Sequence, residues 1–386
     1  MKKYLSGCFA LAVILMCFTV SVSAAKGVTE SPNVKIVIDG QIGTYKNPPI
    51  SLNGRTLLPL KEILVNLGVQ DDNEHIQWNS AERSVTIVKD SQKLYLKIGS
   101  DKATVDSEEV VLDAAPIIYK DKTYIPVKFV AQSLGKKVIW DGSSKSVLIR
   151  DEEQFNHIKD ILVKSDAAMK AIKDCKMNLD ASVDTKQGSM SYNLGINSNV
   201  SIDMLKKKVY LGMKMNMAAI NMNMDMYLAD GKIYMKNPLT NKWEKRTLEQ
   251  SEYDKIFQQN NNIDIFDGTD ALYAGLKEVK SENTNEILLE GDVFLGDLFK
   301  MAGQGAVASK VEFDKFNVKM SIDKNTYTLN SITMKLDFHS TDGTVKGASA
   351  EVKCDYTDYN SNVDIAVPED VVKNAVENSD LKFSLN

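Results

Sequence analysis

Residues that carry metal and proton chemistry are scarce in this sequence. Its 386 residues include only three histidines, His75, His157 and His339, and no two of them have the spacing of a paired metal motif. The sequence also contains no G-x-S-x-G, H-E-x-x-H or C-x-x-C motif and no phosphate-binding glycine loop. Its carboxylates are dispersed, so no glycosidase pair can be nominated. We therefore expect a protein that is not an enzyme, with no catalytic residues, no metal site and no cofactor.

An excess of basic residues is also absent. Lys and Arg number 47 against 52 Asp and Glu, which gives a formal net charge of -5, and no basic stripe is evident. Nucleic acids are bound largely by Lys and Arg side chains that neutralise phosphates. The composition therefore argues against a nucleic-acid partner.

Long apolar runs occur only near the start of the chain. Residues 1–25 combine Lys2-Lys3, an apolar stretch over Leu11–Val22 and the small residues Ser23-Ala24-Ala25, which is typical of a secretory signal peptide. The apolar stretch is too short to span a bilayer stably. We expect an exported protein, secreted or associated with the cell surface, with no transmembrane segment after cleavage.

Cysteine is scarce once this leader is removed. Cys8 and Cys17 leave with it, and Cys175 and Cys354 remain. Export permits a disulfide between these two residues. Each also shares the alternation of its apolar neighbours, which favours burial as a free thiol. The sequence leaves both possibilities open.

Residues 33–151 contain an internal repeat. In each copy a proline is followed ten residues later by a second proline, which starts a short predicted helix. A Leu-Gly pair ends that helix, because the glycine can adopt the positive φ of a C-terminal cap. A tryptophan then begins a predicted hairpin. Neither copy buries much surface alone, so we expect one pseudo-symmetric α+β unit. The matching segments are 56–61 and 123–128, 67–68 and 134–135, Trp78 and Trp140, and 85–87 and 147–149.

These signatures resemble the copper amine oxidase N-terminal-like domain of secreted bacterial proteins. The match rests on T-(L/Y)-(L/I)-P-(L/V)-K, Leu-Gly and Trp-(Asn/Asp), and it covers residues 33–151. The resemblance does not imply an oxidase, because copper amine oxidase chemistry needs a histidine cluster that this chain lacks. It implies a spacer module or one that faces the cell wall, with a cell-wall polymer as a possible partner.

Residues 152–386 predict a second domain that opens with an amphipathic helix over 151–172. Alternating segments follow, and short helices are predicted at 248–259, 269–276 and 293–301. Further strands are predicted up to Val363–Ile365, with a closing helix from Val367. A large antiparallel sheet with one apolar face and a few covering helices is an α+β arrangement.

The most regular alternation lies in residues 209–228. Apolar side chains occupy every second position up to Met217 and resume with the other parity from Ile220. A hairpin explains the change of parity if Met217 and Ile220 face each other across Ala218-Ala219, although alanine is a poor turn residue. Ten apolar side chains then share one sheet face, and we expect the helix over 158–172 to cover it.

The second domain resembles the LppX/LolA-like lipoprotein fold. The residues that carry this resemblance are the opening helix, Tyr227, Gly231, Tyr234-Met235, Lys242-Trp243, Ile365 to Val371 and Ala375. It covers about residues 152–380 and implies a half-barrel whose concave face holds lipid acyl chains.

The sheet face that carries these ten side chains, six of them methionine, is called the methionine face. Three interpretations of it stay open: a filled core, a cavity for an apolar ligand, and a metal or redox function. Two functions follow. The first is an exported, non-catalytic envelope protein with a surface-binding repeat module and a domain that binds a lipid or another apolar molecule. The second is a structural or adhesive wall protein with a filled core. The candidate cavity residues are Leu211, Met213, Met215, Met217, Ile220, Met222, Met224, Met226, Met320 and Met334.

Overall fold

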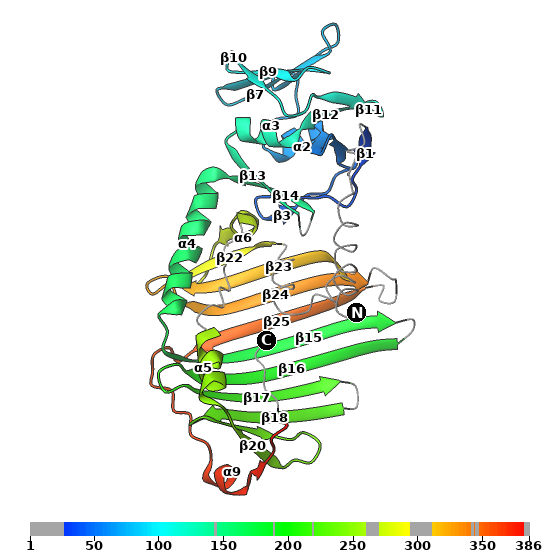
Figure 1. The fold of residues 1–386 in the computed structure, drawn as a ribbon. Helices are drawn as coiled ribbons and strands as arrows, with labels where there is room; N and C mark the ends of the chain where they lie inside the picture. Colours follow the sequence, from blue (N-terminus) through cyan, green and yellow to red (C-terminus); the bar gives the residue numbers. More distant parts are fainter. Residues whose placement is uncertain are drawn as a thin grey trace, which may run out of the picture. The chain divides into compact units, whose positions relative to one another are not determined.

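The computed structural model forms two compact units (Figure 1). The first contains Tyr45–Leu134 and the segment that ends at Pro32, and the second contains Asn33–Thr44 and the chain from Gly135 onward. The predicted leader lies outside the described residues, and so does the helix predicted at 293–301 apart from Val293 itself. The residues described are 27–142, 145–187, 190–217, 220–259, 270–293, 311–340, 343 and 347–381.

From residue 27 onward, the first unit is built on two five-stranded sheets and two short helices. One sheet has the order β1-β4-β5-β12-β11 and the other the order β10-β9-β8-β7-β6. The helices are α2 (Leu60–Asn66) and α3 (Val127–Ser133). The strands are β1 (Val28–Glu30), β4 (Ile50–Leu52), β5 (Arg55–Pro59), β6 (Ile76–Asn79), β7 (Ser84–Lys89), β8 (Gln92–Lys97), β9 (Lys102–Val105), β10 (Glu108–Val111), β11 (Ile117–Tyr119) and β12 (Lys122–Pro126).

The two copies of the repeat meet where β5 pairs antiparallel with β12. This pairing sets Leu58 opposite Ile125, and both side chains are fully buried. The predicted hairpins also form, since Trp78 pairs with Val85 in β6–β7. Each copy therefore contributes one strand to the centre of a shared sheet, which confirms that the copies pack together.

Both short helices begin and end as the repeat predicts. α2 follows Pro59 and α3 follows Pro126, and each proline occupies the N-cap position with φ of -57° and -63°. Gly68 and Gly135 come after the helices with φ of 83° and 73°, the left-handed conformation that a C-terminal cap favours. The proline and glycine positions therefore set the length of each helix.

The second unit begins with a small sheet of order β13-β14-β2-β3. Its strands are β2 (Lys35–Ile38), β3 (Gln41–Ile42), β13 (Lys136–Asp141) and β14 (Ser146–Asp151). β14, the last strand of the repeat, pairs parallel with β2, so Leu148 lies opposite Val37. Both side chains join the core beneath the opening helix. The repeat and the large-sheet region thus share a core, and the compact units do not divide at the predicted boundary between residues 151 and 152.

The opening helix is α4 (Glu152–Lys170). Its N-cap is Asp151, whose carboxylate accepts hydrogen bonds from the backbone N–H groups of Glu153 and Gln154, each at 3.1 Å. The helix buries Phe155, Ile158, Ile161, Leu162 and Ser165.

The remaining strands form one twelve-stranded sheet of order β21-β22-β23-β24-β25-β15-β16-β17-β18-β19-β20-β26 (Figure 1). Neighbours are antiparallel except β20 and β26. Strands far outnumber helices among the described residues, and the arrangement is consistent with an α+β class. The strands are β15 (Asp174–Gln187), β16 (Met190–Asp203), β17 (Lys208–Met217), β18 (Ile220–Ala229), β19 (Lys232–Lys236), β20 (Trp243–Thr247), β21 (Lys277–Val279), β22 (Glu286–Asp292), β23 (Val311–Asp323), β24 (Leu329–Ser340), β25 (Ala348–Thr357) and β26 (Val376–Glu377).

Three further helices accompany this sheet in the part of the chain that the structure describes. α5 (Gln250–Gln259) and α6 (Asp270–Gly275) confirm two of the predicted short helices, and α9 (Glu369–Asn374) confirms the closing helix. The strand predicted at Val363–Ile365 is wrong, since this segment is not in a strand. Its two apolar side chains are nevertheless buried, with 4% and 5% exposed, so their alternation reflects packing without strand pairing.

Candidate functional site

The methionine hairpin forms in the predicted register. β17 pairs antiparallel with β18, and Met217 lies opposite Ile220 across Ala218-Ala219. The conformation of those two alanines lies outside the described residues. Met215 lies opposite Met222 and Met213 opposite Met224. Because residues paired across strands share a face, the hairpin places the ten alternating apolar side chains from Val209 to Leu228 on one side of the sheet.

Register pairs extend this apolar face across the neighbouring strands. One row runs Met334, Val352, Ala181, Ile196, Met215 and Met222, and each residue pairs with the next. A parallel row joins Met320 to Met213 and Met224 through Ile332, Cys354, Leu179 and Ser198. All the candidate cavity residues therefore share one face.

The two ends of this face are packed. At one end α4, α6 and strands of the small sheet enclose Leu289, Val318, Met320 and Ile322, all at most 3% exposed. At the other end α5 contributes Tyr253 and Phe257 to a core with Met226, Leu228 and Ile233. The prediction that the opening helix covers the methionine hairpin is wrong. α4 packs on the β22–β24 end, because it directly follows β14 and shares a core with it.

Within the described residues, the middle of the face is open. Met217 is 46% exposed and Ile220 is 53% exposed. Met213, Met215, Met222 and Met224 are half-buried, although they pair with one another in the sheet. The candidate residues therefore fall into three groups. Met226 and Met320 are core residues, Leu211 and Met334 border the two cores, and the six hairpin residues from Met213 to Met224 line an open wall.

Sequence reasoning missed half of this wall. Leu179, Ala181 and Val183 on β15, and Leu194 and Ile196 on β16, share the face and are half-buried. Their alternation is visible in the sequence, but alanine and the interposed Ser198 weaken the apolar signal. The methionine pattern points to β17 and β18, with Met320 on β23 and Met334 on β24, and leaves out the wall residues of β15 and β16.

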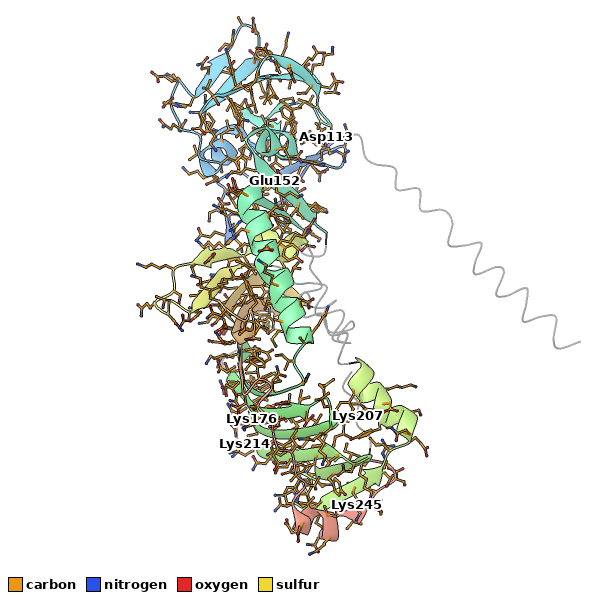
Figure 2. The ribbon with its side chains drawn as sticks, turned by 90° about the vertical axis from the view of Figure 1, so that its left-hand side faces the viewer. Asp113, Glu152, Lys176, Lys207, Lys214 and Lys245 are labelled. Carbon is orange, nitrogen blue, oxygen red and sulfur yellow. The ribbon has the colours of Figure 1, made fainter. Side chains whose placement is uncertain are left out.

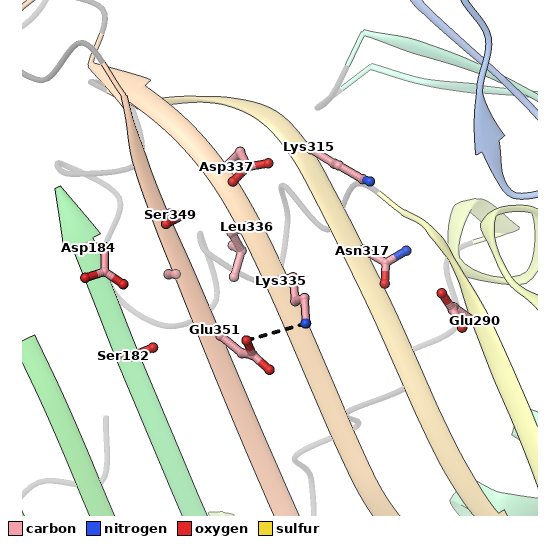
Figure 3. A pocket seen from close by; sticks show the side chains of 11 residues that line it. Ser182, Asp184, Glu290, Lys315, Asn317, Lys335, Leu336, Asp337, Ser349 and Glu351 are labelled. Atoms are coloured by element: carbon pink, nitrogen blue, oxygen red, sulfur yellow. Dashed lines mark ion pairs between the residues drawn. The ribbon is translucent and has the colours of Figure 1, made fainter. Parts of the chain in front are cut away.

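The opposite face is polar along β15 and β22–β25. Figure 2 shows Lys176 and Lys214 on the side of the sheet away from α5, as their parity requires. A hollow of about 350 Å³ opens on this face between β15 and β22, and Lys335 and Glu351 form an ion pair of 3.5 Å in it (Figure 3). Its other polar lining residues include Asp184, Lys315 and Asp337. A second hollow of about 430 Å³ lies at the strand tips and includes Tyr192 and Phe338. Neither of these two hollows is lined by a hairpin methionine.

Cys175 and Cys354 are free thiols. Register places Cys354 opposite Leu179, four positions along β15 from Cys175, which corresponds to about 13 Å along a strand. A disulfide needs Cα atoms within about 7 Å, so this geometry does not permit the bridge. Burial raises the pKa of the Cys175 thiol to about 11 and also raises the pKa of Cys354.

Each histidine has a carboxylate partner on a different part of the fold. His75 lies 2.7 Å from Asp72, His157 2.7 Å from Glu278, and His339 3.0 Å from Asp314. Among the described residues, no group of three or more His, Cys, Asp or Glu side chains is placed to hold a metal ion. In the same part of the chain, no helix is both long and apolar enough to cross a membrane.

Six of the residues that carry the second resemblance come together as a packing cluster. Tyr234, Val371 and Ala375 are buried there, and Tyr227, Trp243 and Val367 pack against them. The ring centroids of Tyr227 and Trp243 are 5.8 Å apart. α9 thus closes the β18–β20 edge. The sequence signature is explained by packing at this edge and does not by itself mark a ligand site.

Comparison with known proteins places most of this second region in a family. Residues 157–289 and 295–376 match a family of unknown function, DUF6612. The chain belongs to this family. Residues 37–149 match the copper amine oxidase N-terminal domain, which confirms the first resemblance.

Individual relatives are distant. A protease inhibitor of Brevibacillus choshinensis is 27% identical over 155 residues, which are 40% of this chain and 44% of that protein. The chain thus spans less than half the length of this relative.

Similar solved structures include the lipoprotein LppX of Mycobacterium tuberculosis and LprF of Mycobacterium bovis. LppX is 13% identical, with a TM-score of 0.33, over 55% of this chain and 99% of LppX. LprF is 9% identical, with a TM-score of 0.32, over 55% of this chain and 97% of LprF. A putative outer membrane lipoprotein-sorting protein domain of Vibrio parahaemolyticus is 8% identical, with a TM-score of 0.19, over 57% and 97%. The second resemblance noted in the sequence is to this group of proteins.

Proposed function

We propose that the DUF6612 region is a non-catalytic binding module. It holds a lipid acyl chain, or a similar apolar ligand, against the open wall that the hairpin residues from Met213 to Met224 line. The observation that carries the proposal is the contrast within one face. Met226 and Met320 are 1% and 3% exposed, whereas Met217 and Ile220 are 46% and 53% exposed. A core that was simply filled would bury the hairpin tip as thoroughly as the two ends.

The dimensions of the wall suit such a ligand. The row from Met334 to Met222 crosses six strands, which corresponds to about 24 Å at about 4.8 Å per strand. A contiguous exposed apolar patch of this kind is typical of an interaction site in soluble proteins. Each buried methylene of a ligand would contribute about 0.8 kcal/mol. We take the sheet as a half-barrel wall whose apolar face is the inner one.

Methionine is well suited to this role because its unbranched side chain adapts to ligands of varied shape. Met215 and Met222 face each other near the centre of the wall. The three histidine–carboxylate pairs lie elsewhere, which supports a module that binds without catalysis. We further propose that the protein works outside the cell, as its predicted leader implies.

The test is uptake of a fluorescent long-chain fatty acid by the chain from Gly27 onward. A fragment starting at residue 152 is unsuitable, because it lacks Val37 and Leu148 of the shared core. We expect Met222→Glu to weaken uptake by roughly tenfold or more, since an acyl chain would bury the new charge. Asn223→Glu is the matched control, because Asn223 lies on the opposite face and pairs with Lys214. Equal loss in both variants, or no uptake by the unmodified chain, would contradict the proposal.

A second function is favoured by the two repeat tryptophans, which we propose bind a cell-wall polysaccharide. Trp78 and Trp140 each occupy an edge strand of their own sheet, and they are 43% and 54% exposed. Both copies thus keep a large aromatic ring that packing alone does not require. An exposed indole offers an apolar face for a sugar ring and an N–H donor.

Sedimentation with purified wall polysaccharide tests this second function. We expect Trp78→Ala and Trp140→Ala to reduce the bound fraction several-fold, because truncated Trp anchors often dominate binding energy. Ile118→Ala is the matched control, since Ile118 is also 43% exposed. If the Ile118→Ala and Trp78→Ala variants sediment alike, the tryptophans do not bind the polymer.

A further inference from the structure

The methionine hairpin departs from the residue choice of the rest of its sheet. Strands favour β-branched and aromatic residues. On the same face β23 and β24 carry Val318, Ile322 and Ile332 and only one methionine each, Met320 and Met334. Methionine is a good helix former and brings no advantage to strand pairing. Its repetition at alternate positions of β17 and β18 therefore indicates a property of the thioether side chain itself.

Five of these methionines are accessible and adjacent. We call a methionine of this hairpin open when its side chain is half-buried or exposed. Met226 lies on the same hairpin but is only 1% exposed, so it is not one of the open methionines. Cross-strand partners on a shared face have Cβ atoms about 5 Å apart, so the sulfur atoms lie in one patch. The open methionines are Met213, Met215, Met217, Met222 and Met224.

The cysteines do not compete with them for oxidants. Burial raises the pKa of the Cys175 thiol to about 11, and Cys354 is 9% exposed with a raised pKa. The reactive form of cysteine is the thiolate, and it is scarce at neutral pH at both positions. On the hairpin itself the accessible sulfur atoms therefore belong to the open methionines, and Met177 and Met334 on neighbouring strands of the same face are half-buried as well.

We propose that the open methionines are an oxidation site that switches off the apolar wall. Each thioether sulfur takes one oxygen atom from a two-electron oxidant and becomes a sulfoxide. Hydrogen peroxide is thereby reduced to water, and a hypohalous acid to a halide ion and a proton. The sulfoxide is polar, so an oxidised wall no longer offers an apolar surface. The switch rests on the proposed binding function, but the oxidation site itself does not.

The first experiment maps oxidation on the chain from Gly27 onward. The protein is treated with graded hydrogen peroxide, and sulfoxide at each methionine is followed by peptide mass spectrometry. We expect the open methionines to oxidise at least about tenfold faster than Met226 and Met320, which are enclosed in the two packed ends. Equal rates at Met226 or Met320 would overturn the oxidation site. Circular dichroism after each treatment verifies that the chain stays folded.

The second experiment measures fatty-acid uptake before and after oxidation. We expect sulfoxide at the open methionines to lower the affinity about tenfold or more. In a variant with all five replaced by leucine, the affinity after peroxide should equal that of the same variant before peroxide, whatever its starting value. Unchanged uptake by a fully oxidised wall would overturn the switch. If the untreated chain takes up no fatty acid, the binding function fails and the switch with it, while the oxidation map still decides the site.

Discussion

The packed ends and the open middle of the large sheet have the same alternation of apolar and polar residues. Val318, Met320 and Ile322 on β23 and Met213 and Met215 on β17 are all apolar at every second position. The first set is at most 3% exposed, whereas the second is only half-buried. The difference in exposure depends on whether other elements pack on that face of the strands. Alternation therefore indicates which face is apolar, and contacts with other elements decide whether it becomes core.

The largest expected difference between the two regions is in stability. Leu289 is fully buried in the packed end, so Leu289→Ala should lower the free energy of unfolding by about 2–5 kcal/mol. Met215→Ala removes a half-buried side chain that leaves no enclosed cavity, and we expect a loss below about 1.5 kcal/mol. Urea unfolding of the two variants measures both values. Similar losses would show that the middle of the wall is packed in solution.

The sequence predicts the strands, the parity and the register of the methionine hairpin because these depend on local alternation. It also predicts the start of α4, since Asp151 precedes an apolar stripe. The surface that α4 covers could not be predicted, because an apolar stripe fits any apolar face. That choice depends on β14 pairing with β2, more than one hundred residues earlier. The open wall is a consequence of this distant pairing.

A smaller effect is expected at the cap that anchors the covering helix of the packed end. The Asp151 carboxylate accepts two backbone hydrogen bonds at the start of α4. Asp151→Ala should cost about 1 kcal/mol, and Asp151→Ser should restore most of it, because serine is also a good N-cap. Thermal unfolding at neutral pH measures the two variants. An Asp151→Ser variant as unstable as Asp151→Ala would show that the charge matters more than the cap.

Acid should act on the hairpin at the packed end through Asp323. Backbone hydrogen bonds from Thr326 and Asn325 lower the pKa of this carboxyl below its usual value of 3.8. Its contribution to stability is therefore present above the unfolded-state pKa and is lost as the pH falls through the lower, folded-state pKa. We expect the free energy of unfolding of Asp323→Asn to be lower than that of the unmodified chain at pH 7. This difference in free energy should disappear below about pH 4. If the difference in free energy of unfolding is constant from pH 7 to pH 3, the Asp323 carboxyl is not the cause of the loss of stability in acid.

The smallest effect is expected on the polar face behind the open wall. Lys335 and Glu351 form a cross-strand ion pair of 3.5 Å, and their side chains are 62% and 50% exposed. Exposed pairs of this kind contribute about 0–1 kcal/mol and are screened by salt. Lys335→Ala should therefore change urea unfolding little, and any change should shrink at high salt.

Because this face is solvated, the variant should also leave fatty-acid uptake unchanged, whereas Met222→Glu on the other face should not. A loss of uptake in Lys335→Ala would place the ligand in the polar hollow, and the open wall would then be the wrong face.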